Sequence, residues 1–172
     1  MIIWLIGMSS AGKTVISREL YSLIKEKYKN TVFVDGDILR DMSNNDVDHS
    51  IAGRKKNSDR ICRLCQFLDN QDINVVCAVL SIFHEAQQWN RENYKKYFEI
   101  YLDVPFEILK QRNNKGLYTK ALAGEINNVV GVDIEFKPPK NPEMVIKNDG
   151  SKSPARIAQM ILEEINQINK WD

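Results

Sequence analysis

The sequence predicts an α/β fold in which a doubly wound parallel sheet of about five strands is flanked by helices. Continuous apolar runs, such as residues 31–34, are typical of strands that a parallel sheet buries on both faces. Helical patterns alternate with these runs along the chain. A chain of 172 residues is also long enough to bury one real core. We therefore expect a single domain over residues 1–172.

The expected elements follow one another in a regular order. We expect strands at residues 1–6, 31–34, 73–80, 98–102 and 144–146, and helices at 13–28, through 61–68, through 89–94, from 103–105 and from 153–154 onward. Residues 40–54 are polar and unpatterned, which favours a loop or short helix above the site. Residues 112–131 are basic, are punctuated by glycines and lack a strong apolar period. A segment of this kind is typical of a lid, and we call it the lid segment.

The first strand runs directly into a phosphate-binding pattern. Residues 7–14 read Gly-Met-Ser-Ser-Ala-Gly-Lys-Thr, which matches G-x-x-x-x-G-K-T, and a helical pattern follows at once. Glycines permit backbone angles that let successive N–H groups surround phosphate oxygens, and a helix N-terminus adds its dipole. Lys13 offers a cation for the outer phosphates, and the Thr14 hydroxyl can ligate Mg²⁺. The expected ATP-binding residues of this loop are Gly7, Ser9, Ser10, Ala11, Gly12, Lys13 and Thr14.

Composition and charge limit the partners. The formal net charge of +1 argues against nucleic acid or a membrane surface as a partner, and no apolar stretch is long enough to span a bilayer. Cys62, Cys65 and Cys77 form no disulfide framework, and neither His49 nor His84 completes a metal-binding pattern with them. We expect buried free thiols and a cytoplasmic protein.

Two carboxylates follow the second strand, in the order Asp35-Gly36-Asp37. Ligands of open α/β sheets bind at this carboxyl edge. A switch GTPase would carry D-x-x-G and N-K-x-D, and neither is present. The carboxylates, the local basic residues and the lid segment favour a phosphotransferase, and a non-catalytic nucleotide-binding module is the alternative.

Seven motifs together resemble the adenylylsulfate (APS) kinase family of P-loop kinases. They are residues 7–14, 35–40, 54–60, 98–103, 112–118, 123–126 and 131–133, and they extend over nearly the whole chain. The Lys-Gly-Leu-Tyr block with the following Ala-Gly-Glu-Ile is specific to that family. The resemblance implies ATP and Mg²⁺ as cofactors and transfer of the γ-phosphate to the 3′-hydroxyl of a nucleoside 5′-phosphosulfate. It also implies a homodimer.

The same resemblance implies a role for individual residues. Asp37 would orient and deprotonate the 3′-hydroxyl, and Lys13 would be the second catalytic residue, stabilising charge on the transferring group. Arg112 and Lys115 would close onto ATP with the lid segment. The implied substrate-binding residues are Asp35, Asp37, Arg40, His49, Arg54, Asn57, Ser81, Ile82, Lys115, Gly116, Leu117 and Val129.

The departures from the family concentrate on the nucleotide base. APS kinases clamp adenine between two phenylalanines, and this chain has His49 and Val129 at the matching positions. Stacking of this kind contributes on the order of 1–3 kcal/mol per base. The Ser-Pro pair expected after the third strand is Ser81-Ile82. This pattern resembles the family members of bacterial capsule pathways that phosphorylate the 3′-hydroxyl of cytidine 5′-diphosphoramidate. APS is the alternative acceptor.

Overall fold

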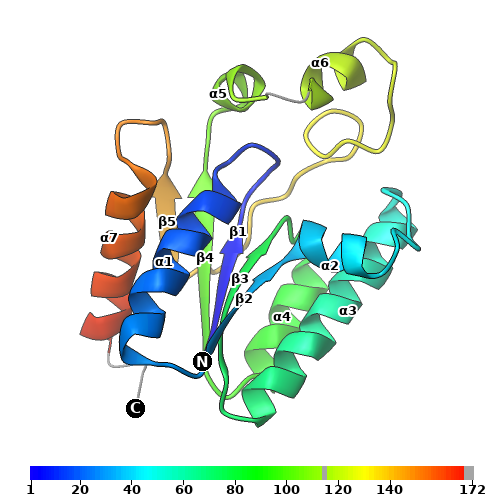
Figure 1. Ribbon diagram of the computed structural model, residues 1–172. Helices are drawn as coiled ribbons and strands as arrows, with labels where there is room; N and C mark the ends of the chain where they lie inside the picture. Colours follow the sequence, from blue (N-terminus) through cyan, green and yellow to red (C-terminus); the bar gives the residue numbers. More distant parts are fainter. Residues whose placement is uncertain (114–115, 169–172) are drawn as a thin grey trace.

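A computed structural model describes residues 1–113 and 116–168 (Figure 1). Across these residues the core is a five-stranded parallel sheet of order β2-β3-β1-β4-β5. The sheet confirms the predicted fold class. The first strand therefore lies at the centre, with the loop that follows it in the middle of the carboxyl edge. The strands are β1 (Ile2–Ile6), β2 (Thr31–Asp35), β3 (Asn74–Val79), β4 (Tyr97–Asp103) and β5 (Met144–Lys147).

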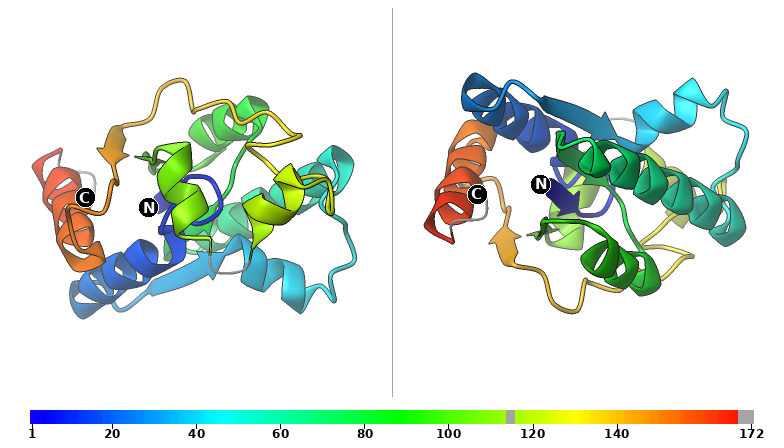
Figure 2. Two further views of the ribbon diagram at one scale, coloured as in Figure 1. Left: turned by 90° about the horizontal axis from the view of Figure 1, so that it is seen from above. Right: turned by 90° about the horizontal axis from the view of Figure 1, so that it is seen from below.

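Helices cover both faces of the sheet and its carboxyl edge. One face packs against α1 (Lys13–Lys27) and α7 (Pro154–Gln167), and the other against α3 (Ile51–Asn70) and α4 (His84–Asn93). Three short helices lie toward the carboxyl edge, where the view from above shows them around the loop after β1 (Figure 2). These are α2 (Gly36–Met42), α5 (Phe106–Gln111) and α6 (Leu117–Leu122).

The central strand explains the continuous apolar pattern. Every residue of β1 is buried, and successive side chains enter opposite halves of the core. Ile3 and Leu5 pack in the cluster that includes α1 and α7, whereas Trp4 and Ile6 pack in the cluster that includes α3 and α4. Because both faces are covered, no position in the strand faces water, and alternation of polar and apolar residues is lost.

Two helical stretches were not indicated by the apolar periodicity: the first turns of α3 and the whole of α6. The α3 helix begins at Ile51, inside the segment expected to be a loop or short helix, and its first turn is capped by Ser50 Oγ, which accepts from the Gly53 N–H at 3.1 Å. The lid segment contains α6, which no apolar period signalled. Both stretches are rich in polar residues, so their helices leave little periodic trace. Among the described residues, no helix is both long and apolar enough to cross a membrane.

Candidate active site

The phosphate-binding loop is held in a strained, open curve between β1 and α1. Ser10 and Gly12 have φ values of 65° and 92°, in the left-handed region, and Gly12 is the N-cap of α1. A Cβ on Gly7 would lie 3.1 Å from the Ala11 Cβ and 3.3 Å from the Leu102 carbonyl oxygen, so a side chain here would push its neighbours apart by a few tenths of an ångström. The Ala11 N–H donates to the Met8 carbonyl at 3.2 Å within this loop, and the curve turns further backbone amides toward an anion at the helix N-terminus.

Two side chains from distant parts of the chain fasten this loop. Asn148, the residue after β5, donates from Nδ2 to the Ala11 carbonyl at 2.9 Å. Tyr118 of α6 donates from its hydroxyl to the Ser9 carbonyl at 2.9 Å, and its side chain is fully buried. Neither residue was predicted to be part of the site, although Tyr118 ends the Lys-Gly-Leu-Tyr block of the family resemblance. The signal for Asn148 was its position directly after the last strand, because that residue must lie at the carboxyl edge.

The Lys13 ammonium lies beside the loop and near two carboxylates. Its Nζ donates to the Met8 carbonyl at 2.8 Å. Burial lowers the pKa of Lys13 to about 8, while the negative charges of Asp37 and Asp35 act in the opposite direction. A partly buried cation with few partners is stabilised strongly by an arriving phosphate, because the anion replaces the interactions with water that the ammonium has lost.

The Asp35 carboxylate connects the loop to the acceptor side. Its Oδ2 accepts from the Thr14 hydroxyl at 2.7 Å, and its Oδ1 accepts from the Asp37 N–H at 2.9 Å, capping α2. Asp35 is 6% exposed. This hydrogen bond holds Asp37 in the first turn of α2, where its charge acts on the Lys13 ammonium.

The Thr14 hydroxyl and the Asp35 carboxylate are also the hard oxygen donors that Mg²⁺ prefers. Within the described residues, no group of three or more His, Cys, Asp or Glu side chains could hold a metal ion. A cation at this edge would therefore have to take most of its ligands from phosphates and water, as Mg²⁺ does in phosphoryl-transfer sites. The residues present fit that arrangement.

Two arginines lie near each other, and Arg54 also lies near Asp37. Arg40 is buried and donates from Nη1 to the carbonyls of Val47 and Asp48 at 2.7 and 2.9 Å. Arg54 donates from Nε to the His49 carbonyl at 2.8 Å. Burial and the positive charge of Arg40 lower the pKa of Arg54. Two guanidinium groups kept this close to each other make a site that attracts an anion.

His49 lies near both cations, and only part of its surface is buried. Burial and the charges of Arg40 and Arg54 lower its pKa, against the opposing effect of Asp37 and Asp48. The imidazole is therefore neutral at pH 7 and can both donate and accept a hydrogen bond.

Asn57 lies one turn after Arg54 on α3 and is 6% exposed. Its Oδ1 is buried and has no hydrogen-bond partner among the described residues. An unsatisfied buried acceptor costs about 1–3 kcal/mol, so this oxygen is suited to accept from a substrate hydroxyl or amine.

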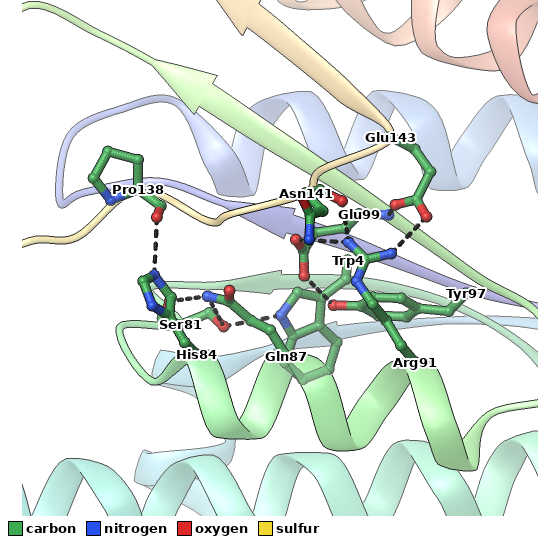
Figure 3. A network of polar contacts seen from close by, with 10 residues as sticks. All are labelled: Trp4, Ser81, His84, Gln87, Arg91, Tyr97, Glu99, Pro138, Asn141 and Glu143. Carbon is green, nitrogen blue, oxygen red and sulfur yellow. Dashed lines mark hydrogen bonds and ion pairs between the residues drawn. The ribbon is translucent and has the colours of Figure 1, made fainter.

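The end of β3 is fixed by a polar network (Figure 3). Ser81, with φ of 48°, receives a hydrogen bond at Oγ from Trp4 Nε1 at 3.2 Å and one at its carbonyl from Gln87 Nε2 at 2.8 Å. Ile82 follows and is half-buried. The Ser81 hydroxyl is thus turned toward the protein, and the backbone of this turn is the part held at the carboxyl edge.

Helix α4, which carries Gln87, also holds the segment that leads from the lid segment to β5. We call this segment, residues 132–143, the return segment. Arg91 of α4 pairs with Glu143 at 2.6 Å and with the buried Glu99 at 3.0 Å, and it donates to the Asn141 carbonyl (Figure 3). His84 Nε2 lies 2.9 Å from the Pro138 carbonyl oxygen. This network could not be predicted from the sequence, because its members are spread over more than fifty positions without a motif.

The remaining predicted residues belong to the lid segment. Arg112 is the C-cap of α5. Its guanidinium lies against Gly150, in the turn before α7, because a Cβ added to Gly150 would be only 3.1 Å from Arg112 Nη2. Gly116 is the N-cap of α6 with φ of 68°, and the Leu117 N–H donates to Asn113 Oδ1 at 2.9 Å. Lys115 lies outside the described residues.

Val129 is 4% exposed and packs in the hydrophobic cluster that also holds Tyr118 and Ala121. Its side chain therefore points into the core of the lid segment. Next to it, a hollow of about 570 Å³ opens beside the loop, lined by Met8, Phe106, Gly131 and Phe136 among others.

The three cysteines are free and buried, as expected. Burial raises the pKa of Cys62 to about 12, which makes this thiol unreactive.

The chain matches the family model for adenylylsulphate kinase over residues 1–147. It belongs to the adenylylsulphate kinase family. It is similar to the cytidine diphosphoramidate kinase of Campylobacter jejuni, with 39% identity over 164 residues that cover 95% of each chain. It is also similar to the adenylyl-sulfate kinase of Halothermothrix orenii, with 34% identity over 97% of this chain and 91% of that protein.

A solved structure of the Mycobacterium tuberculosis APS kinase, in complex with AMPPNP and APS, has a TM-score of 0.86 and 29% identity over 96% of both chains. These relatives are P-loop kinases, so this chain is a nucleotide-binding phosphotransferase of the same family. The predicted family, fold class and kinase activity are confirmed.

Proposed function

We propose that this kinase transfers the γ-phosphate of ATP to the 3′-hydroxyl of cytidine 5′-diphosphoramidate, as a step in making a capsule phosphoramidate. The observation that carries the proposal is a contrast within one site. The residues suited to phosphates and to the 3′-hydroxyl match the APS kinase motifs, whereas His49 and Val129 occupy the positions of the two phenylalanines of the adenine clamp. The similarity to the Campylobacter jejuni enzyme supports the same acceptor.

The proposed chemistry uses the phosphate-binding loop for ATP. The loop amides of Ser9, Ser10, Ala11 and Gly12 and the Lys13 ammonium bind the outer phosphates and stabilise the charge that develops on them. Mg²⁺, held by the Thr14 hydroxyl beside Asp35, would neutralise the phosphate oxygens. Arg112 and Lys115 bind ATP from the lid segment, with Gly116 and Leu117 on the acceptor side.

Asp37 acts as the general base. Its carboxylate accepts the proton of the 3′-hydroxyl as that oxygen bonds to the γ-phosphorus, and the bond from this phosphorus to the β–γ bridging oxygen breaks to release ADP. Arg40 and Arg54 bind the 5′-diphosphoramidate end of the acceptor nucleotide. The Asn57 Oδ1, which has no partner among the described residues, accepts a hydrogen bond from the same nucleotide.

The base end suits a small pyrimidine. Because the Val129 side chain is buried in the core, it offers little flat surface to a purine. A neutral His49 imidazole can exchange hydrogen bonds with a base edge. These features favour cytosine over adenine.

The test is ATP consumption with Mg²⁺ and each acceptor in turn: cytidine 5′-diphosphoramidate, CDP and APS. The proposal expects kcat/KM to be highest for the cytidine diphosphoramidate, with the new phosphate on the 3′-oxygen by NMR. A preference for APS would assign the chain to 3′-phosphoadenylylsulfate synthesis instead. ATP binding without turnover of any acceptor would favour the non-catalytic module.

We further propose that the chain acts as a homodimer in the cytoplasm. The family resemblance supports the dimer, and ATP supply and buried free thiols agree with a reducing compartment. Light scattering should give twice the chain mass of 19.9 kDa. A mass of one chain would contradict the dimer.

A further inference from the structure

Arg54 links two segments that lie far apart in the sequence. Besides its bond to the His49 carbonyl, it donates from Nη2 to the Asn128 carbonyl at 2.7 Å. One guanidinium group therefore spans the site from the turn before α3 to the end of the lid segment. These two segments carry the positions that the proposed function assigns to the base, His49 and Val129.

Asp133 holds the second of these segments from the other side. Its Oδ2 accepts from the Asn128 N–H and its Oδ1 from the Val129 N–H, both at 2.6 Å. These two backbone bonds hold the pKa of Asp133 below its usual range, and the charge of Arg54 acts in the same direction. The carboxylate is therefore ionised at pH 7.

Asn128 is consequently fixed at both of its backbone polar groups, its N–H by Asp133 and its C=O by Arg54. Its φ of 64° lies in the left-handed region, which a residue other than glycine keeps only when its surroundings hold it. The turn closes with a bond of 2.8 Å from the Gly131 N–H to the Ile134 carbonyl. The wall opposite His49 is thus a preformed backbone turn rather than a loose loop.

The geometry points to Arg54 and Asp133 as positioning residues that set the base preference of the acceptor site by fixing the turn at Asn128 opposite His49. This inference rests on the proposed function, because it concerns the base of the acceptor nucleotide. It assigns a positioning role to Asp133, whose negative charge would repel a phosphate rather than bind it. We call the pair the Arg54–Asp133 clip.

Two ratios of kcat/KM separate the clip from direct phosphate binding. CDP and ADP differ in the base alone, and their ratio measures base preference. Cytidine 5′-diphosphoramidate and CDP share the base, and their ratio measures recognition of the 5′-end. Arg54→Lys keeps the positive charge but cannot donate to the His49 and Asn128 carbonyls at the same time. Asp133→Asn replaces one carboxylate oxygen by an amide NH₂, which cannot accept a hydrogen bond from a backbone N–H. The control is Asp72→Asn, in an exposed pair with Lys95 beyond the opposite end of β3.

Asp133→Asn should move the CDP to ADP ratio toward one by about tenfold, the equivalent of one charged hydrogen bond, and leave the second ratio within about twofold. Arg54→Lys should move the first ratio in the same direction, and the double variant should add little. Asp72→Asn should change neither. An unchanged base ratio in Asp133→Asn, or a change confined to the second ratio, would overturn the clip.

The wild-type preference and the clip are tested separately by these data. A wild-type preference for ADP would contradict the proposed cytidine acceptor, whereas the clip is judged by whether the variants erase whatever preference exists. If the protein turns over no acceptor, hydrogen exchange of the Asn128 and Val129 amides decides. Asp133→Asn should accelerate exchange at both amides by at least about tenfold while leaving β1 protected, and equal protection in variant and wild type would overturn the clip.

Discussion

The phosphate end and the base end of this site are built by different means. At the phosphate end, a contiguous loop presents its own backbone amides, and the flanking strand and helix fix their direction. At the base end, Arg54 of α3 reaches across the sequence to hold the Asn128 carbonyl, and Asp133 of the return segment holds the Asn128 and Val129 amides of the same turn. The first arrangement is local and tolerates little change, because a side chain at Gly7 would crowd Ala11 and Leu102, and Gly12 has a φ of 92° that side chains disfavour. At the base end, replacing one or two side chains can change which nucleotide base is bound while the phosphoryl-transfer reaction stays the same.

The difference predicts that damage to the phosphate end affects every acceptor equally. Asp37→Asn should lower kcat by up to about 10⁴-fold with cytidine and adenine nucleotides alike, because the general base is lost while ATP contacts remain. ATP affinity, measured by calorimetry, should be nearly unchanged. Asp41→Asn, on the same helix, is the matched control. Near-normal turnover of Asp37→Asn would remove this carboxylate from the role of base.

Lys13→Ala should be almost as damaging. Removing the one loop cation beside the transferring phosphoryl group should lower kcat by about 10²–10³-fold for all acceptors. Steady-state kinetics with Lys27→Ala, from the exposed end of α1, provides the control. A loss of only a few fold, or a loss that depends on the base, would mean that Lys13 does not act on the transferring group.

A change at the base end should shift preference and spare the chemistry. His49→Phe restores one aromatic face, so the kcat/KM for APS should rise by about tenfold relative to that for cytidine 5′-diphosphoramidate, a part of one stacking interaction. His49 is the better site for this test because Val129 is buried, where a larger side chain would strain the core. If His49→Phe lowers kcat equally for both acceptors, then His49 does not face the base.

The two ends also differ in how far the sequence predicts them. The loop, Asp35 and Asp37 follow from a local pattern and from the edge at which strands end. Asn148 could not be found that way, because it lies outside the motifs and contacts a loop near the other end of the chain. Tyr118 and Asp133 lie within motifs of the family resemblance, but the pattern does not reveal that Tyr118 binds the Ser9 carbonyl or that Asp133 holds the turn at Asn128. The lid helix and the start of α3 were missed for a related reason. Their residues are polar, and tertiary contacts rather than an apolar stripe hold them.

The smallest expected effect concerns protons. The pKa of Lys13 is lowered to about 8 in the protein without ATP, and bound phosphates favour the charged ammonium. Below pH 8 the ammonium is already charged, and above it a proton must be taken up on binding. ATP affinity should therefore fall as the pH rises through 8, with proton uptake of less than one per ATP. Calorimetry at pH 8.5 in buffers of different ionisation enthalpy measures this uptake. It should vanish in Lys13→Met, and uptake that persists there would assign the proton to another group.

The most direct test of the contrast between the two ends is a competition in one tube. Equimolar cytidine 5′-diphosphoramidate and APS, limiting ATP and Mg²⁺ are mixed with the enzyme, and ³¹P NMR gives the ratio of the two 3′-phosphorylated products, which equals the ratio of their kcat/KM values. We predict that the cytidine product predominates. Predominance of 3′-phosphoadenylylsulfate would contradict a base end adapted to a pyrimidine.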